Sequence, residues 1–407
     1  MQDKPTYAAV TVAYWGFTLT DGALRMLVLL HFHALGFSPL NLALLFLLYE
    51  AMGILTNFFG GWIGARFGLR LTLFAGLGIQ ILALMLLSFN DPAWVLAVSV
   101  AYVMGAQALS GIAKDLTKMS SKSAVKLVVS DANGALFRWV AALTGSKNAL
   151  KGIGFFLGGA LLQGMGFQGA LWLMAGALAV VLLASLIGIR SDLGKTKTVI
   201  TRGDLFSKTP AINWLSFARV FLFASRDVWF VVGLPIFLSG VLGWSYHQVG
   251  AFMALWIIGY GIVQGIVPHI TRSARDPQSA TRAARLWGFV LAALPLVLGL
   301  ALTQQWSDPG TVLISGLLVF GVIFAINSAL HSYLIVAFAD DDKVSLAVGF
   351  YYMANAVGRF LGTLLSGLVY QLAGLEACLY VSGGMVLIAA LSVCMISPSP
   401  EKQTPAP

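Results

Sequence analysis

The chain has 407 residues, of which 58% are hydrophobic and only 10% are charged, and its formal net charge is +9. Soluble domains contain about 25% charged residues, so this composition excludes an ordinary soluble protein. The two cysteines, Cys378 and Cys394, cannot build a disulfide framework or a thiolate metal site, so we expect neither a metal nor a cofactor.

Twelve apolar stretches divide the chain, and each is long enough to cross a hydrocarbon core of about 30 Å as a helix. The first stretch is too long for the core of a signal peptide and carries charged residues, so we expect it to be retained. The sequence therefore predicts an all-α membrane protein with twelve transmembrane helices. In chain order the stretches cover residues 7–33, 40–63, 71–89, 93–113, 141–165, 170–189, 211–239, 247–270, 286–303, 311–338, 344–372 and 375–396.

Lysine and arginine occur in only one set of the connections between these spans. The odd-numbered connections contain none, whereas the even-numbered ones hold basic residues from Arg66 to Lys343. Basic connections stay in the cytoplasm during insertion, which places both termini inside. We expect a location in a bacterial inner membrane, with the net positive charge beside anionic lipid and no nucleic-acid partner.

The two halves of the chain carry an internal repeat. A polar linker at residues 190–210 separates a first bundle of six helices, 1–189, from a second, 211–396, and residues 397–407 are predicted to be a disordered cytoplasmic tail. Because six is even, both bundles start on the same side, so the repeat is parallel. An offset of 208 residues aligns the fifth span with the eleventh: it pairs Lys151 with Arg359, Gly154 with Gly362, Gly159 with Gly367 and Gly166 with Gly374.

Two local motifs strengthen a resemblance to the major facilitator superfamily of transporters. The segment Gly61-Trp62-Ile63-Gly64-Ala65-Arg66-Phe67-Gly68-Leu69-Arg70 resembles its signature loop, and the glycine run of 152–159 resembles its antiporter motif. Phe156 replaces the proline of that motif, so we infer helix packing from the glycines and not proton antiport. The resemblance implies two parallel six-helix bundles with the substrate bound between them near the midplane.

Several charged residues are predicted to lie deep in the spans, where each costs about 2.5–3.5 kcal/mol to insert. Asp21 and Arg25 are one helical turn apart and can neutralise each other. The adjacent residues Arg226 and Asp227 point about 100° apart, so we expect at least one to find a partner elsewhere. Glu50 is either a protonatable coupling group or the partner of Arg25 on the neighbouring helix.

Two further cations, Lys151 and Arg359, have no acidic residue within a turn of their own helices. We predict that they form a positive cleft for an anion with phosphate-like or carboxylate oxygens. Arg25, Lys147 and Arg226 are expected to assist. The charge-balancing candidates are Asp21, Glu50 and Asp227; the candidate hydrogen-bond donors are Asn148 and Asn355; and the possible lining residues are Gln107, His331 and Asn327.

A lysine recurs every four residues between the fourth and fifth spans, at Lys114, Lys118, Lys122 and Lys126. If this segment is helical, the four lysines form one basic stripe. Two interpretations stay open. The segment is either a surface helix lying on anionic lipid or an electropositive funnel at the cytoplasmic mouth.

Three longer strings are similar to the organoarsenical efflux permeases of the same superfamily. They are residues 14–26, which contain Asp21 and Arg25, residues 114–126, and residues 143–152, which contain Lys147 and Lys151. The resemblance implies export of 1-arseno-3-phosphoglycerate, which a glyceraldehyde-3-phosphate dehydrogenase forms from arsenate. We expect the carrier to be a monomer. The alternatives are a proton-coupled exporter of drugs or sugars and a membrane sensor. We do not expect an enzyme, because no nucleophile–base pair or metal cluster is placed for catalysis.

Overall fold

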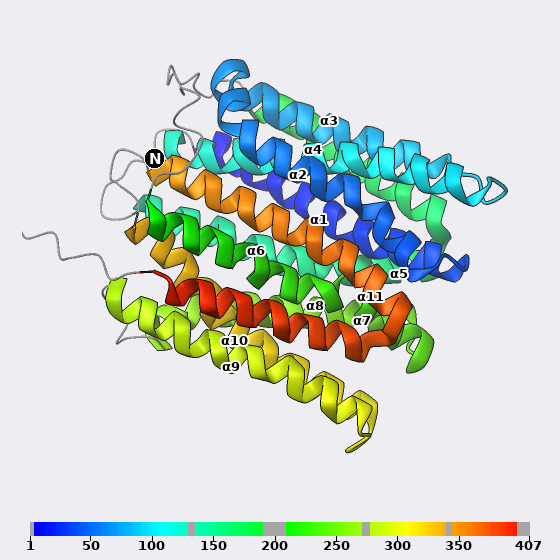
Figure 1. The fold of residues 1–407 in the computed structure, drawn as a ribbon. Helices are drawn as coiled ribbons and strands as arrows, with labels where there is room; N and C mark the ends of the chain where they lie inside the picture. The colour runs from blue at the N-terminus through cyan, green and yellow to red at the C-terminus, as the bar shows by residue number, and fades with distance from the viewer. Residues whose placement is uncertain (1–3, 129–134, 190–208, 271–276, 339–343, 397–407) are drawn as a thin grey trace, which may run out of the picture.

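The computed structural model describes residues 4–128, 135–189, 209–270, 277–338 and 344–396 (Figure 1). Nearly all of the predicted linker, 190–210, and the whole of the predicted tail, 397–407, lie outside these residues. The side chains of residues 60–67 and of Lys122 and Lys126 also lie outside the described part.

Long helices account for almost all of the described residues, which contain no strand. Nine helical segments in this part of the chain are long and apolar enough to cross a membrane. Two of them, 43 and 46 residues long, each have the length of two crossings. The helices are α1 (Lys4–Ala34), α2 (Pro39–Phe67), α3 (Leu69–Ser88), α4 (Leu96–Val128), α5 (Ala135–Gly188), α6 (Pro210–Phe230), α7 (Gly233–Ile236), the π-helix η3 (Phe237–Val241), α8 (Tyr246–Ile270), α9 (Pro277–Thr303), α10 (Pro309–Ala337) and α11 (Val344–Cys394).

Each of the two longest helices contains a sharp bend at a repeat-related glycine. Gly166 in α5 has a φ of 72°, and Gly374 in α11 has a φ of 75°. Only glycine adopts this left-handed region without steric cost. These two glycines therefore allow the chain to leave helical geometry and turn back. With both helices divided at these bends, and with α7 and η3 continuing α6, the described residues contain the twelve predicted spans.

Helix packing confirms the parallel repeat. The two halves meet where α2 packs against α11 and where α5 packs against α8. A Cβ atom at Gly154 would collide with the backbone of α1, and one at its repeat partner Gly362 would collide with the backbone of α6. In the same way, Gly159 approaches α8 and Gly367 approaches α2. The glycine run of the fifth span therefore serves close packing, as expected.

A break in the seventh span positions the residues just before it. Thr209 caps the start of α6, since its side chain accepts a hydrogen bond from the N–H of Ile212, and the helix ends at Phe230. The backbone N–H groups of Val232 and Gly233 donate to Oγ of Ser366 on α11, at 3.1 Å and 3.2 Å. Backbone that leaves helical geometry inside a membrane needs such partners. The break is thereby held against the eleventh span.

Candidate functional site between the two halves

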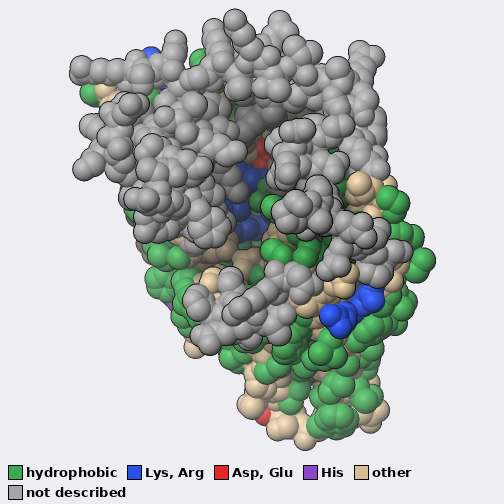
Figure 2. Space-filling view, turned by 90° about the vertical axis from the view of Figure 1, so that its left-hand side faces the viewer, with side chains coloured by type: hydrophobic (Ala, Val, Ile, Leu, Met, Phe, Trp, Pro, Cys, Tyr) green, Lys and Arg blue, Asp and Glu red, His purple; other side chains and the backbone are tan. Residues whose placement is uncertain are grey.

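A cavity of about 60 Å³ lies between the halves, with walls from α1, α5, α6 and α8. Figure 2 views the end of the molecule that carries the N-terminus and shows a hollow in which Lys, Arg and acidic side chains are visible. Aromatic side chains line the cavity together with the polar ones. Its lining residues are Arg25, Met26, Asn148, Lys151, Phe155, Arg226, Asp227, Phe230, Val231, Met253, Trp256, Ile257 and Tyr260.

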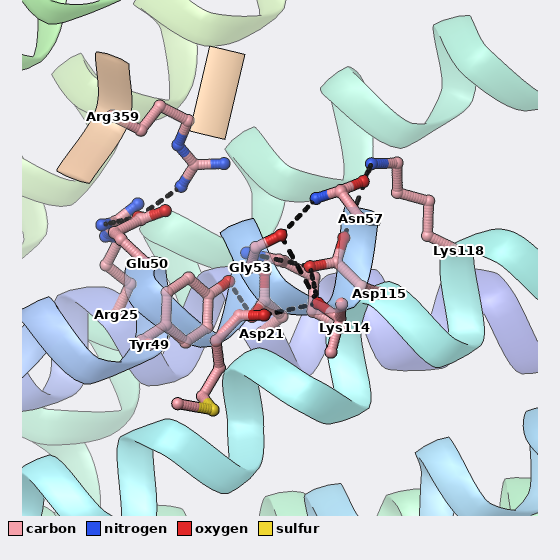
Figure 3. Close-up of polar contacts among 12 residues, drawn as sticks. Asp21, Arg25, Tyr49, Glu50, Gly53, Asn57, Lys114, Asp115, Lys118 and Arg359 are labelled. Carbon is pink, nitrogen blue, oxygen red and sulfur yellow. Dashed lines mark hydrogen bonds and ion pairs between the residues drawn. The ribbon is translucent and has the colours of Figure 1, made fainter. Parts of the chain in front are cut away.

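Glu50 on α2 holds one arginine from each half of the protein. Its Oε1 accepts from Nη2 of Arg25 on α1 at 2.8 Å and from Nη2 of Arg359 on α11 at 2.6 Å (Figure 3). Glu50 is only 1% exposed, so these charge-assisted bonds compensate a buried carboxylate. Arg359 has no acidic residue within a turn of its own helix, as the sequence shows, but it pairs with Glu50 on the neighbouring helix α2 and is therefore not free for an anion alone.

The Asp21 carboxylate does not pair with Arg25. Its Oδ1 accepts from the Tyr49 hydroxyl at 2.6 Å (Figure 3). Between the two interpretations of Glu50, the structure shows the ion pair with Arg25. Residues one turn apart on α1 therefore use partners on α2 in preference to each other, because the neighbouring helix lies against the same face.

Arg226 and Asp227 do pair with each other. Nε of Arg226 donates to Oδ1 of Asp227 at 2.7 Å, since the long arginine side chain curls back over the angle between the two residues. The other oxygen, Oδ2, lies 3.7 Å from Nε of Arg359. The expectation that at least one of the two finds a partner elsewhere is thus met by Asp227, whose carboxylate also faces α11, and not by Arg226.

Lys151 has no carboxylate within ion-pair distance among the described residues. Its Nζ lies 5.6 Å from the centroid of the Phe155 ring, and the residue lines the cavity. Asn148, one turn earlier on α5, lines the cavity too. Lys147 makes an interaction of its own and is not a lining residue.

The internal repeat explains why Lys151 differs from Arg359. The offset of 208 residues that relates Lys151 to Arg359 also relates Ile258 to Glu50. Arg359 meets Glu50 at the contact of α11 with α2. At the related contact of α5 with α8, the Ile258 side chain lies against Gly152, next to Lys151. The pseudo-symmetric site therefore keeps its cation and lacks its carboxylate.

The basic segment after the fourth span continues α4 without a break, and its first two lysines face the protein. Nζ of Lys114 lies 4.0 Å from the Tyr49 ring centroid and 4.0 Å from Oδ2 of Asp115. Nζ of Lys118 is 3.2 Å from Oδ1 of Asn57 on α2 (Figure 3). The interpretation as a helix on the lipid surface is thus wrong for these two lysines, whereas Lys122 and Lys126 lie outside the described side chains.

The remaining predicted polar residues do not line this cavity. Asn327 is 1% exposed and donates from Nδ2 to the carbonyl of Ala284 at 3.1 Å, which packs α10 against α9. Gln107 Nε2, His331 Nδ1 and Asn355 Oδ1 are buried without a hydrogen-bond partner among the described residues.

Sequence reasoning missed the aromatic wall of the cavity. Trp256 and Tyr260 stack on each other with ring centroids 6.0 Å apart, and Nε1 of Trp256 donates to the carbonyl of Leu317 at 2.8 Å. In the sequence these rings are four residues apart within an apolar span, which is also the spacing of ordinary packing residues. No signal in the sequence separates the two roles.

Comparisons with known proteins agree with this architecture. The family described as Major Facilitator Superfamily matches residues 6–334 and 279–407. Among 303 matching solved chains is one described as a POT family transporter in complex with thioalcohol conjugated peptide. It has a TM-score of 0.74 and 13% identity, and the match covers 95% of this chain and 94% of that chain. At this identity the likeness concerns the fold alone.

No curated protein matches the chain, so that comparison adds no support to the closer resemblance to organoarsenical permeases. The family match covers the whole chain from residue 6 onward. Together with the parallel repeat and the cavity between the halves, it shows that the chain belongs to the major facilitator superfamily, whose members are membrane transporters and not enzymes.

Proposed function

We propose that this transporter exports a small organic anion by alternating access, with Lys151 and Arg226 as its principal cationic contacts. The observation that carries the proposal is the position of Lys151, which lines the cavity between the halves without a carboxylate among the described residues. A buried cation without a counter-ion is costly, and an anionic cargo supplies the missing charge.

The charges around the cavity support an anion. The cations Arg25, Lys151, Arg226 and Arg359 outnumber the carboxylates of Asp21, Glu50 and Asp227. The arginine side chains Arg25, Arg226 and Arg359 remain 13%, 16% and 17% exposed, so the cluster is within reach of solvent. Lys114 and Lys118 extend the positive surface along α4.

The proposed cargo is 1-arseno-3-phosphoglycerate, and the proposed result is arsenate resistance. The resemblance of residues 14–26, 114–126 and 143–152 to organoarsenical efflux permeases motivates this choice. The ester is a polyanion, and it suits a cavity with several cations. Trivalent arsenic needs clustered thiols, but Cys378 and Cys394 are 16 residues apart on α11, about 24 Å along the helix.

The proposal includes a monomer in a bacterial inner membrane with both termini in the cytoplasm. The described chain starts and ends at the same end of the molecule, as Figure 1 shows for the first residues of α1 and the last of α11. The basic connections assign that end to the cytoplasm. A dehydrogenase that forms the ester from arsenate would supply the cargo at this face.

Everted vesicles test the proposal directly. Vesicles with the transporter receive arsenate, NAD and a glyceraldehyde-3-phosphate dehydrogenase with its substrate, and arsenic trapped inside is measured with and without a pH gradient. We expect accumulation with the wild-type protein and loss with Lys151→Gln. Arg282→Gln, an exposed cation on α9, is the matched control and should transport normally. Equal accumulation in vesicles that lack the transporter would refute the proposal.

The aromatic wall of the cavity favours a second candidate, a proton-coupled exporter of drugs or sugars. Phe155, Phe230, Trp256 and Tyr260 offer rings to an apolar or sugar-like cargo. This candidate predicts efflux of neutral or cationic compounds that depends on the pH gradient. It also predicts that Lys151→Gln leaves that efflux unchanged, which separates it from the anion exporter.

A further inference from the structure

A second buried cation lies beside the cavity, on the same helix as Arg226. Arg219 of α6 is 5% exposed, and its Nη1 donates to Oγ of Ser328 at 3.0 Å and to the Ser328 carbonyl at 3.3 Å. No carboxylate lies within ion-pair distance of it among the described residues. Its Nε is buried and has no hydrogen-bond partner in the part of the chain that the structure describes.

A buried histidine on α10 lies near Ser328 as well. His331 lies one turn after Ser328 on α10, so both project from one face of that helix. It is 1% exposed, and its Nδ1 has no hydrogen-bond partner in the described part of the chain. Arg219 contacts Ser328 and His331 lies one turn from it, so two buried nitrogen atoms without a hydrogen-bond partner in the described part of the chain lie near one serine.

Arg285 illustrates what a structural arginine does in this protein. Its guanidinium donates to the carbonyls of Val393, Cys394 and Ile396, at 3.3, 3.4 and 2.7 Å. These carbonyls lie at and just beyond the end of α11, so Arg285 caps that helix. Arg219 has no such set of acceptors.

Arg219 lies next to residues that line the cavity. Both guanidinium carbons lie over the ring of Phe223, that of Arg219 at 4.0 Å and that of Arg226 at 4.9 Å from its centroid. They are therefore no more than about 9 Å apart. Tyr260 lines the cavity, and its hydroxyl lies 3.4 Å from Oγ of Ser328. The two positions share one wall.

We propose that Arg219, Ser328 and His331 form a second oxyanion subsite, so that the cargo carries oxyanion groups at both ends. Lys151 and Arg226 hold one end, and Arg219 holds the other. A charge-assisted pair places nitrogen and oxygen about 2.8 Å apart. Because the two guanidinium carbons are no more than about 9 Å apart, one anion with oxyanion groups at both ends of a three-carbon chain can reach both. This inference rests on the proposed function, and it narrows the cargo to bis-oxyanions.

The test compares two anions that differ in one charged end, by calorimetric titration of the full-length transporter in detergent micelles. 3-Phosphoglycerate carries a phosphate and a carboxylate, whereas glycerol 3-phosphate carries the phosphate alone. For the wild-type protein we expect at least tenfold tighter binding of 3-phosphoglycerate. Arg219→Gln should lose this preference and bind glycerol 3-phosphate as before, while Lys151→Gln should weaken both anions.

Two further variants keep the test decisive if Arg219→Gln does not fold. Arg219→Lys retains the charge without the planar fork, and His331→Gln retains a polar side chain; each should reduce the preference severalfold. An unchanged preference in these variants would overturn the second subsite. If neither anion binds the wild-type protein, the proposed function fails together with the subsite. Binding of both anions with equal affinity would overturn the subsite alone.

Discussion

Glu50 and Arg359 form an ion pair of 2.6 Å that joins α2 in the first half to α11 in the second. The same carboxylate oxygen also binds Arg25 at 2.8 Å. One buried acid therefore holds two cations from opposite halves. In a carrier that works by moving its halves, this contact must rearrange when the site opens to the other side of the membrane.

Replacing Glu50 with Gln should destabilise the empty carrier and strengthen anion binding. Two arginines then lose their shared counter-ion, and removing one partner of a buried pair costs about 3–5 kcal/mol. We expect an apparent unfolding temperature several degrees lower without ligand and largely restored by 3-phosphoglycerate. Thermal unfolding with and without the anion measures both effects. Equal unfolding temperatures for the variant in the two conditions would contradict this role of Glu50.

Under the proposed export of an arsenate ester, neutral substitutions at Lys151 and Arg359 should abolish arsenate resistance while membrane insertion stays normal. For Lys151 the lost contact is to the cargo, and for Arg359 it is the bridge between the halves. Growth of cells on arsenate, with the amount of protein in the membrane as the control, measures the effect. Lys151→Arg should retain part of the resistance, because it keeps the charge. Full resistance in both neutral variants would remove these residues from the site.

An acidic residue at position 258 should inactivate the transporter without unfolding it. Ile258→Glu would give Lys151 the carboxylate that Arg359 already has in Glu50, and the internal ion pair would compete with the anion. We expect binding of 3-phosphoglycerate to weaken at least tenfold. Ile258→Gln is the matched control, since it adds polarity without charge and should bind more tightly than Ile258→Glu. Similar affinities for the two variants would show that charge at this position is unimportant.

Alanine substitutions at two glycines of α5 should show that close helix packing needs one of them and not the other. A Cβ at Gly154 would collide with the backbone of α1, so Gly154→Ala should lower the yield of folded protein. Gly164 lies on the same helix with open space around it, and Gly164→Ala should be tolerated. Size-exclusion chromatography of both variants measures folding. Normal behaviour of Gly154→Ala would mean that α1 and α5 separate more easily than this structure indicates.

Lys118 on α4 should speed the capture of the cargo through its positive charge. Lys118→Gln removes a cation from the positive surface along α4, so KM should rise at low ionic strength while kcat changes little. Salt screens charges over about 10 Å at 0.1 M, and the difference from the wild-type protein should shrink as salt is added. Transport kinetics in vesicles at two salt concentrations measure this. A change in kcat that is independent of salt would indicate a structural role for Lys118.

The spans and the repeat were predictable because they depend on local chemistry. A membrane-spanning segment needs about 20 apolar residues whatever its neighbours are, and the positions of lysine and arginine report the side of each connection. Gly166 and Gly374 follow the same logic, since their backbone conformation requires glycine at both repeat-related bends.

The pairing of the buried charges was decided only by tertiary structure. The sequence left two roles open for Glu50 and offered Arg359 no acidic residue within a turn of its own helix. Spacing along one helix does not tell which residues the neighbouring helix brings against it. The structure brings α2 against α11 and joins the two residues. Electrostatic energy depends on distance in space, and that distance is set by which helices pack together. The unpaired Lys151 beside Ile258 is the result of that packing.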